Sequence, residues 1–171
     1  KAAIRAGARS IEHASLIDDE ALALAKAKGV WLVMDIFNGD YIEEVGTRDG
    51  WPADYLRKNR ETTDIQRTQF TKAVRAGVRM AYGTDAGVYP HGDNAKQFAY
   101  MVRYGMTPMA AIQSATVNAA DLLGWSKDVG GRGLPLSQQM IFYEEYARAD
   151  GPGRVGHIGE GLLGPTLIHF G

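Results

Sequence analysis

An aspartate and a histidine stand where two short apolar runs of the sequence end. Asp85 follows VRMAY within Gly-Thr-Asp-Ala-Gly, and His13 follows SIE in the stretch SIEHAS. Carboxylate oxygen and imidazole nitrogen are ordinary ligands of Zn²⁺, and a bound divalent ion lowers the pKa of water enough to make a nucleophile at neutral pH. The pair therefore indicates a hydrolytic metal site, in which the Asp85 carboxylate could also accept the proton of that water.

Three further residues are candidates for contacts with the substrate of such a site. Asp35 ends the apolar run VWLVMD, and Tyr89 and His91 lie in the loop VYPHGDN shortly after Asp85. Proline and glycine flank the histidine and are typical of a turn, so we expect His91 on a loop close to the strand end.

Each candidate also has a plain structural interpretation. Asp85 can cap the turn that follows a strand, and Asp35 can do the same at the Asn-Gly dipeptide 38–39. His13 can be an ordinary core or surface residue, and His91 can serve only as a turn residue. The residue types and their spacing leave these alternatives open.

The segments that must position these side chains repeat one sequence pattern: the end of a helix, a glycine and a short apolar run. A glycine directly after a helix is typical of a C-cap, because it adopts the left-handed conformation without strain. The three glycines are Gly7, Gly29 and Gly77, and the runs that follow them span 8–14, 30–36 and 78–84. Alternating helices and strands predict neighbouring parallel strands in an α/β fold.

The spacing from these glycines predicts one shared face. His13, Asp35 and Asp85 each lie an even number of residues past their glycine, and side chains alternate along a strand with period two. The C-terminal ends of parallel strands form the active face of a barrel and also the ligand site of an open doubly wound sheet. The count alone therefore does not choose between a barrel and an open sheet.

Helix starts and one long connection complete the pattern. Asp18 and Thr107-Pro108 predict N-caps, and the segments 63–66 and 94–97 fit capping boxes. Residues 37–61 show no clear element, but their aromatic residues argue against disorder, so we expect a lid over the strand ends. The basic residues of this segment, at 57–60, are expected to be solvated, or to hold a substrate carboxylate if the lid closes.

The composition excludes several classes of protein. With 19 basic and 20 acidic side chains, the charge is too balanced to suggest a nucleic acid or a membrane surface as partner. The absence of cysteine excludes disulfides and any cysteine-based site, and no apolar run approaches the length of a membrane span. The first residues read as the end of a helix, so we expect the natural N-terminus to be missing; the compartment, cytoplasm or periplasm, is not determined.

The last 42 residues differ in character from the rest. Residues 130–171 hold 10 of the 21 glycines and three of the six prolines. The string GEGLLG at 159–164 matches a dinucleotide-binding fingerprint, but Pro165 follows it and no acidic residue lies some 20 positions further on, so we reject that interpretation. We expect an irregular, glycine-rich tail that packs poorly against the α/β part and is either frame-shifted, fused or divergent.

The stretches SIEHAS and YGTDAG, with the helix MTPMAAIQSATVNAADLLG, resemble strands six and eight and the closing helix of the amidohydrolase superfamily. The segments around DIFNGDYIEEVGTRDGWP and GVYPHGDNAKQF resemble its Xaa-Pro dipeptidase-like or imidazolonepropionase-like branch. The resemblance covers residues 1 to about 129, which we take as the C-terminal part of a barrel, with 130–171 as a divergent tail.

The resemblance implies a TIM-type (β/α)₈ barrel, of which this chain holds the last three strands and their helices. It implies one or two divalent metal ions, most simply zinc, and hydrolysis of an amide or peptide C–N bond in a dipeptide or similar small amide. His13 resembles the metal ligand of strand six, and Asp85 the strand-eight aspartate that binds metal and shuttles the proton. His91 resembles a residue on the substrate side.

Several parts of the family's site have no counterpart in this chain. The His-x-His of strand one, the carboxylated lysine of strand four and the histidine of strand five are absent. We therefore expect the chain alone to bind zinc weakly, to be inactive, and to self-associate through open sheet edges. The rival hypotheses are a non-catalytic fragment and an unrelated α/β small-molecule-binding domain.

Overall fold

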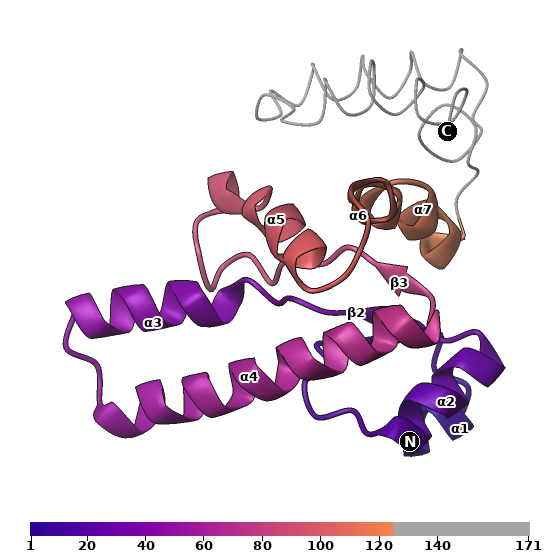
Figure 1. Ribbon diagram of the computed structural model, residues 1–171, viewed down its shortest axis with the longest axis horizontal. Helices are drawn as coiled ribbons and strands as arrows, with labels where there is room; N and C mark the ends of the chain where they lie inside the picture. Colours follow the sequence, from indigo (N-terminus) through magenta and orange to yellow (C-terminus); the bar gives the residue numbers. More distant parts are fainter. Residues whose placement is uncertain (125–171) are drawn as a thin grey trace, which may run out of the picture. The chain divides into compact units, whose positions relative to one another are not determined.

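The computed structural model of the protein describes residues 1–124 (Figure 1). The chain divides into two compact units, residues 1–118 and 119–171, and the sheet and its surrounding helices belong to the first. The expectations for the tail at 130–171 lie outside the described residues.

A three-stranded parallel sheet forms the centre of the first unit. Its strands are β1 (Ser10–Glu12), β2 (Trp31–Val33) and β3 (Met80–Ala81), in the order β1-β2-β3. Ser10 pairs with Trp31 and Leu32 pairs with Met80, and both strand pairs are parallel. The prediction of three neighbouring parallel strands is confirmed, although the ladders are shorter than the apolar runs that predicted them.

The helices before β2 begin and end close to where the sequence predicts. They are α1 (Ala2–Arg5) and α2 (Asp19–Lys28). The Asp18 side chain accepts a hydrogen bond from the backbone N–H of Ala21 at 2.8 Å, which caps the first turn of α2. Gly29 ends α2 with φ 66°, a left-handed conformation that would strain a residue with a side chain.

Two helices occupy the segment that showed no clear element in the sequence, so the expectation of an irregular connection is wrong; a role as a lid stays a prediction. They are α3 (Asn38–Arg48) and α4 (Ala53–Ala76), which form the long helical hairpin in Figure 1. The predicted capping box at 63–66 is also wrong, because Thr63 and Gln66 are buried residues in the middle of α4. Gly77 ends α4 with φ 67°, as the sequence predicts.

Gly39, in the Asn-Gly dipeptide that suggested a turn, is a small residue at a contact between α3 and α4. A Cβ added at Gly39 would lie 2.8 Å from the Cβ of Thr63, so the two helices approach more closely than an alanine would permit. Asn59 donates to the Gly39 carbonyl at 2.8 Å, and Arg60 pairs with Glu43 at 2.5 Å. Close packing and these polar contacts together hold the hairpin.

We expect Gly39→Ala to destabilise the protein by about 1–3 kcal/mol, the usual effect of overpacking a tight contact. The added methyl group must push α3 away from Thr63, and the measurement is urea denaturation. Gly92→Ala is the matched control, because a Cβ at Gly92 meets nothing within 4 Å. Equal stability of the two variants would contradict the tight crossing.

Between β3 and residue 124, where the described part of the chain ends, lie a 3₁₀ turn and three helices: η1 (His91–Asp93), α5 (Lys96–Arg103), α6 (Pro108–Ala115) and α7 (Val117–Leu123). The predicted cap at Thr107 is confirmed, since its side chain accepts from the N–H of Ala110 at 3.1 Å. The capping box at 94–97 is wrong, because α5 starts from Ala95 without a side-chain cap. Gln97 is buried and forms hydrogen bonds with backbone groups instead.

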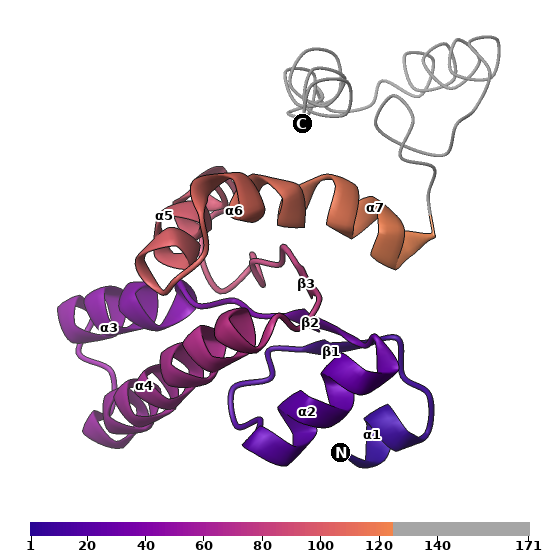
Figure 2. The ribbon, with the colours of Figure 1, turned by 45° about the vertical axis from the view of Figure 1, so that its right-hand side comes forward.

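The core lies between the sheet and the helices that follow its strands. Figure 2 shows α2 and α4 side by side, and they contact each other. The largest fully buried apolar side chains are Ile4, Leu32, Met34, Ile36, Phe70 and Met101. Each such burial contributes about 1.5–3 kcal/mol relative to an exposed side chain.

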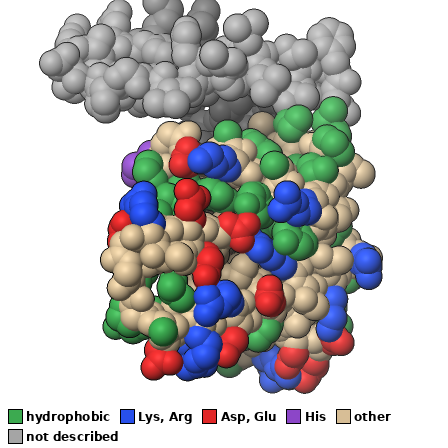
Figure 3. Space-filling view, turned by 60° about the vertical axis from the view of Figure 1, so that its left-hand side comes forward, with side chains coloured by type: hydrophobic (Ala, Val, Ile, Leu, Met, Phe, Trp, Pro, Cys, Tyr) green, Lys and Arg blue, Asp and Glu red, His purple; other side chains and the backbone are tan. Residues whose placement is uncertain are grey.

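The surface carries charges of both signs. On the face in Figure 3, acidic and basic side chains are interspersed. Arg57 pairs with Glu61 and Asp54 on α4, which agrees with a solvated role for this part of the chain. Among the described residues, no helix is both long enough and apolar enough to cross a membrane.

Candidate metal centre

The segments that follow the three strands bring one imidazole and two carboxylates together. One ligand atom each from His13, Asp35 and Asp85 lies within 4.8 Å of the others. His13 follows β1, Asp35 follows β2 and Asp85 follows β3. The shared position predicted for these three residues agrees with this arrangement, and Asp35, which the sequence suggested as a substrate contact, is a third possible ligand.

The backbone holds two of the three in an unusual conformation. His13 has φ 59° and Asp85 has φ 50°, and Ala14 beside His13 has φ 49°. Residues with a side chain rarely adopt this left-handed region, and such residues concentrate at functional sites. The His13 N–H still donates to the Val33 carbonyl at 2.8 Å, so the ladder anchors the residue up to this point.

Asp35 has three side-chain contacts, through both of its carboxylate oxygens. Its Oδ1 lies 2.9 Å from His13 Nδ1 and accepts from Gln66 Nε2 at 3.1 Å. Its Oδ2 accepts from Asn38 Nδ2 at 2.8 Å. The Asn38 contact agrees in part with the expected role of Asp35 at the 38–39 turn, but the other two contacts tie it to the cluster.

Asn38 also connects two strand ends. Its Nδ2 lies 3.5 Å from Asp85 Oδ2, in addition to its shorter bond to Asp35. Asn38 is the first residue of α3, and Gln66 lies in the middle of α4. The helical hairpin therefore supplies the polar groups that surround the carboxylates.

Burial and charge shift the ionisation of the pair in defined directions. Burial raises the pKa of Asp35 above its ordinary value, and the neighbouring His13 opposes that shift. The negative charge of Asp35 raises the pKa of His13, while partial burial opposes this. A buried carboxylate with one imidazole as its main counter-charge is a favourable setting for a cation.

Gln97 binds backbone groups beside two of the strand ends. Its Nε2 donates to the carbonyls of Met34 at 2.7 Å and Gly83 at 2.9 Å, and its Oε1 accepts from the Phe37 N–H at 3.0 Å. The side chain is fully buried. One residue of α5 thus satisfies backbone groups that lie one or two positions from Asp35 and Asp85.

Gly83 permits the close approach of β2 to the loop that carries Asp85. A Cβ at Gly83 would lie 2.3 Å from the Cγ1 of Val33. We expect Gly83→Ala to displace this loop and weaken zinc binding by about 10-fold, comparable to the loss of an outer-shell contact. The measurement is competition with a chromophoric chelator.

Removal of the obstructing side chain should restore the site. In the double variant Gly83→Ala with Val33→Ala, the added methyl group no longer meets Cγ1, so zinc affinity should recover most of the loss. No recovery in the double variant would show that Gly83 acts by some other means than its contact with Val33.

The two loop candidates have different environments. Tyr89 is buried, packs edge-on against Phe37 at 4.9 Å, and lies near enough to Asp35 and Asp85 for their charges to add to the rise that burial causes in its pKa. His91 is exposed in η1 and is not part of the ligand cluster. The expected role of His91 toward a substrate stays a prediction.

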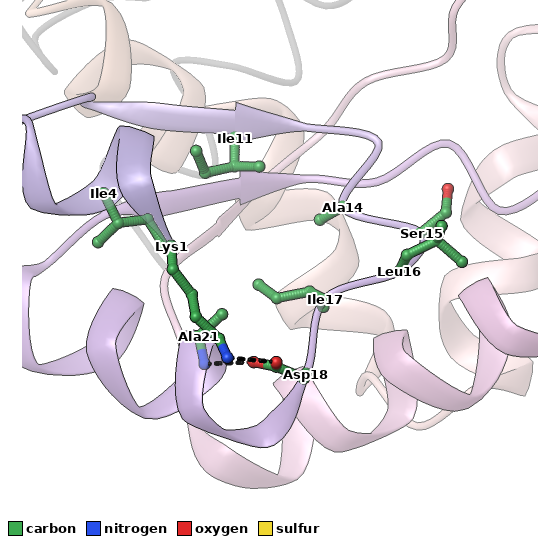
Figure 4. Close-up of a pocket in the computed structure, with 9 residues that line it drawn as sticks. All are labelled: Lys1, Ile4, Ile11, Ala14, Ser15, Leu16, Ile17, Asp18 and Ala21. Atoms are coloured by element: carbon green, nitrogen blue, oxygen red, sulfur yellow. Dashed lines mark hydrogen bonds and ion pairs between the residues drawn. The ribbon is translucent and has the colours of Figure 1, made fainter.

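A separate cavity of about 410 Å³ lies beside β1 and the start of α2 (Figure 4). Ile4, Ile11 and Ile17 line it, and Lys1 pairs with Asp18 at its edge at a distance of 2.6 Å. None of the three cluster residues lines this cavity, so it is not the candidate centre.

Asn38, Gln66 and Gln97 are site residues that were not predicted from the sequence. The Asn-Gly dipeptide indicated a turn at Asn38, and the segments 63–66 and 94–97 indicated capping boxes at the two glutamines. The helical spacing of positions 63, 66, 70 and 73 could have indicated the burial of Gln66, because it places this glutamine on one helix face with the apolar Phe70 and Ala73. A glutamine on the buried face of a long helix needs polar partners in the interior.

Comparison with known proteins decides the family. The sequence profile of the Amidohydrolase family matches residues 1–131, which is more than half of the chain. The chain belongs to the amidohydrolase family. The region matched includes all three cluster residues of this amidohydrolase.

Solved and curated relatives agree with this membership. A crystal structure of a Xaa-Pro dipeptidase with bound methionine superposes with a TM-score of 0.68 at 40% identity, over 76% of this chain and 32% of that one. Ochratoxinase of Aspergillus niger is 36% identical over 127 residues, 69% of this chain and 24% of its own length. The chain therefore spans about a quarter to a third of the length of these relatives.

Two further similarities differ in length, one over a short segment and one over most of the chain. Acyl-CoA dehydrogenase IpdE1 of Mycobacterium tuberculosis is 63% identical over 49 residues, which is 29% of this chain and 13% of that protein. The uncharacterised protein Rv2915c of the same organism is 30% identical over 155 residues, 90% of this chain and 40% of its own length.

The cluster of His13, Asp35 and Asp85 has a donor set that suits a divalent metal. It offers one imidazole nitrogen and carboxylate oxygens from two residues, the ligand types that zinc takes in proteins. Asp35 is buried with the His13 imidazole as its main counter-charge, so a nearby cation would further offset the cost of burying this carboxylate.

Proposed function

We propose that this chain contributes part of a metal-dependent active site that hydrolyses an amide or peptide C–N bond of a dipeptide or similar small amide. The observation that carries the proposal is the convergence of His13, Asp35 and Asp85 after three parallel strands, in a member of the amidohydrolase family. We propose further that the sheet is part of a (β/α)₈ barrel.

His13 and Asp85 would hold the metal ion, which we propose to be zinc. When bound, such an ion supplies a water molecule activated for attack at neutral pH. Asp85 would keep a carboxylate oxygen available to take a proton and later return it to the leaving nitrogen. Asn38 would keep the Asp85 carboxylate in place through its amide, and Tyr89 would close one side of the site.

The substrate class is supported by the relatives. A Xaa-Pro dipeptidase and a prolidase complexed with N-methylphosphonate-L-proline are among the similar structures, at 40% and 27% identity. We therefore propose Xaa-Pro or related dipeptides as substrates. His91, on its exposed 3₁₀ turn, is a candidate contact for the polar end of such a substrate.

The test uses the purified 171-residue protein, loaded with zinc and assayed with a set of Xaa-Pro and other dipeptides. We expect weak zinc binding and no hydrolysis above the buffer rate, because this chain offers only two residues that match the family's ligands. Turnover that disappears in Asp85→Asn would show instead that the chain assembles a working site by itself. No zinc binding at all would contradict the proposed metal site.

Self-association is proposed through the sheet. In the described sheet, β1 and β3 each have a neighbour on one side only. Unpaired strand edges are templates for pairing with another chain. Light scattering that shows monomers at all concentrations would contradict this proposal.

We also propose that the segment related to IpdE1 includes residues 132–171, so that the chain joins sequences of two families. The Amidohydrolase profile ends at residue 131, and the 63% identity to IpdE1 exceeds the 36% to ochratoxinase. The longer similarity to Rv2915c favours a divergent tail of one family instead. Resequencing the gene across codons 120–140 tests the frame shift, which one uninterrupted frame in independent clones would contradict. A single family that matches the resequenced chain throughout would contradict a fusion.

A further inference from the structure

The inference concerns Asp35, and it rests on the proposed metal site. Two of its contacts come from the helical hairpin: Gln66 donates to Oδ1 at 3.1 Å and Asn38 donates to Oδ2 at 2.8 Å. Both amide side chains are buried, as is Asp35. The carboxylate is therefore held at both oxygens before His13 is considered.

The imidazole of His13 has far less support of its own. Its side chain is 54% exposed, whereas that of Asp35 is 10% exposed. The side-chain hydrogen bond found for His13 is the one from Nδ1 to Asp35 Oδ1 at 2.9 Å. The orientation of an exposed ring is thus set by a buried partner.

An aspartate at this place can act on the tautomer of the histidine. A carboxylate accepts but does not donate, so a neutral imidazole beside it carries its proton on the nitrogen that faces the carboxylate. An unconstrained neutral imidazole favours the proton on Nε2. A hydrogen bond at Nδ1 reverses this preference and leaves the Nε2 lone pair free for a metal.

We propose that Asp35 is a positioning residue for His13, which fixes the Nδ1–H tautomer and presents Nε2 to the metal, while Gln66 and Asn38 fix Asp35. This differs from a role as a direct ligand and from the substrate contact that the sequence suggested. It also assigns the α3–α4 hairpin a part in the site.

The first measurement needs no metal. In protein with ¹⁵N-labelled histidine, at a pH where the ring is neutral, the ring nitrogen shifts report the tautomer, and the His13→Gln variant identifies the signal. We expect mainly the Nδ1–H form in the wild type and a shift toward Nε2–H in Asp35→Asn and Gln66→Leu. Asp64→Asn is the matched control, since Asp64 is an exposed residue of α4. A wild-type His13 in the Nε2–H form would overturn the proposal.

The second measurement is zinc affinity by chelator competition. Asp35→Asn should weaken binding by about 10–100-fold, the range for a partner of a metal-bound histidine, and Gln66→Leu by less in the same direction. An unchanged tautomer in Asp35→Asn together with loss of one oxygen ligand by X-ray absorption would show a direct ligand and overturn the positioning role. A wild-type protein that binds no zinc would contradict the proposed metal site, whereas the tautomer result would still decide the positioning role.

Discussion

Asp85→Asn is expected to weaken zinc binding by on the order of 100-fold or more. Loss of an outer partner of a metal ligand typically costs 10–100-fold, and Asp85 is proposed as a direct ligand whose negative charge is lost in the variant. The side chain keeps its size, so the contact with Asn38 at 3.5 Å can persist. Chelator competition at constant pH measures the effect.

The matched control is again Asp64→Asn, which makes the same chemical change on the exposed surface of α4. It should leave zinc affinity within about 2-fold, because an exposed charge is screened by solvent. If Asp85→Asn binds zinc as tightly as this control, Asp85 is not a ligand, and its left-handed conformation needs another explanation.

Gln97→Leu is expected to destabilise the protein by roughly 3 kcal/mol or more. The substitution leaves one N–H and two carbonyl groups without the partner that Gln97 provides, and each unsatisfied buried group costs about 1–3 kcal/mol. The bonds to Met34 and Gly83 also tie β2 to the loop that precedes Asp85. We therefore expect weaker zinc binding in the fraction that remains folded.

Urea denaturation, followed by far-UV circular dichroism, measures the stability change. Gln113→Leu makes the same substitution on α6, at a partly exposed position, and should change the free energy of unfolding by less than about 1 kcal/mol. A Gln97→Leu protein as stable as Gln113→Leu would mean that water replaces the lost hydrogen bonds.

Local signals explain why part of the fold could be predicted. Gly29 and Gly77 adopt the left-handed conformation at the ends of α2 and α4, and Asp18 and Thr107 cap their helices. These effects act within one helical turn, so they are visible in a few consecutive residues. They located the strands between the helices, and with them the parallel sheet.

The helical hairpin could not be recognised in the same way. Gly39 and Gly46 look like breaks in a helix when only neighbours in sequence are considered, since glycine lowers helix propensity. In the structure, Gly39 faces Thr63 and Gly46 faces Leu56 and Trp51, so the missing side chains permit close packing. The gain from packing outweighs the cost in propensity.

The sequence by itself determined the family resemblance and the residues with metal-binding chemistry, because ligand type and strand period are local properties. It placed His13, Asp35 and Asp85 on one face of the sheet. Only the tertiary structure decided that Asp35 contacts His13, that His91 lies outside the cluster, and that Gln66 and Asn38 hold Asp35. The contacts of Asp35 join residues up to 31 positions apart, and only packing of the hairpin against the strand ends brings them within hydrogen-bond distance.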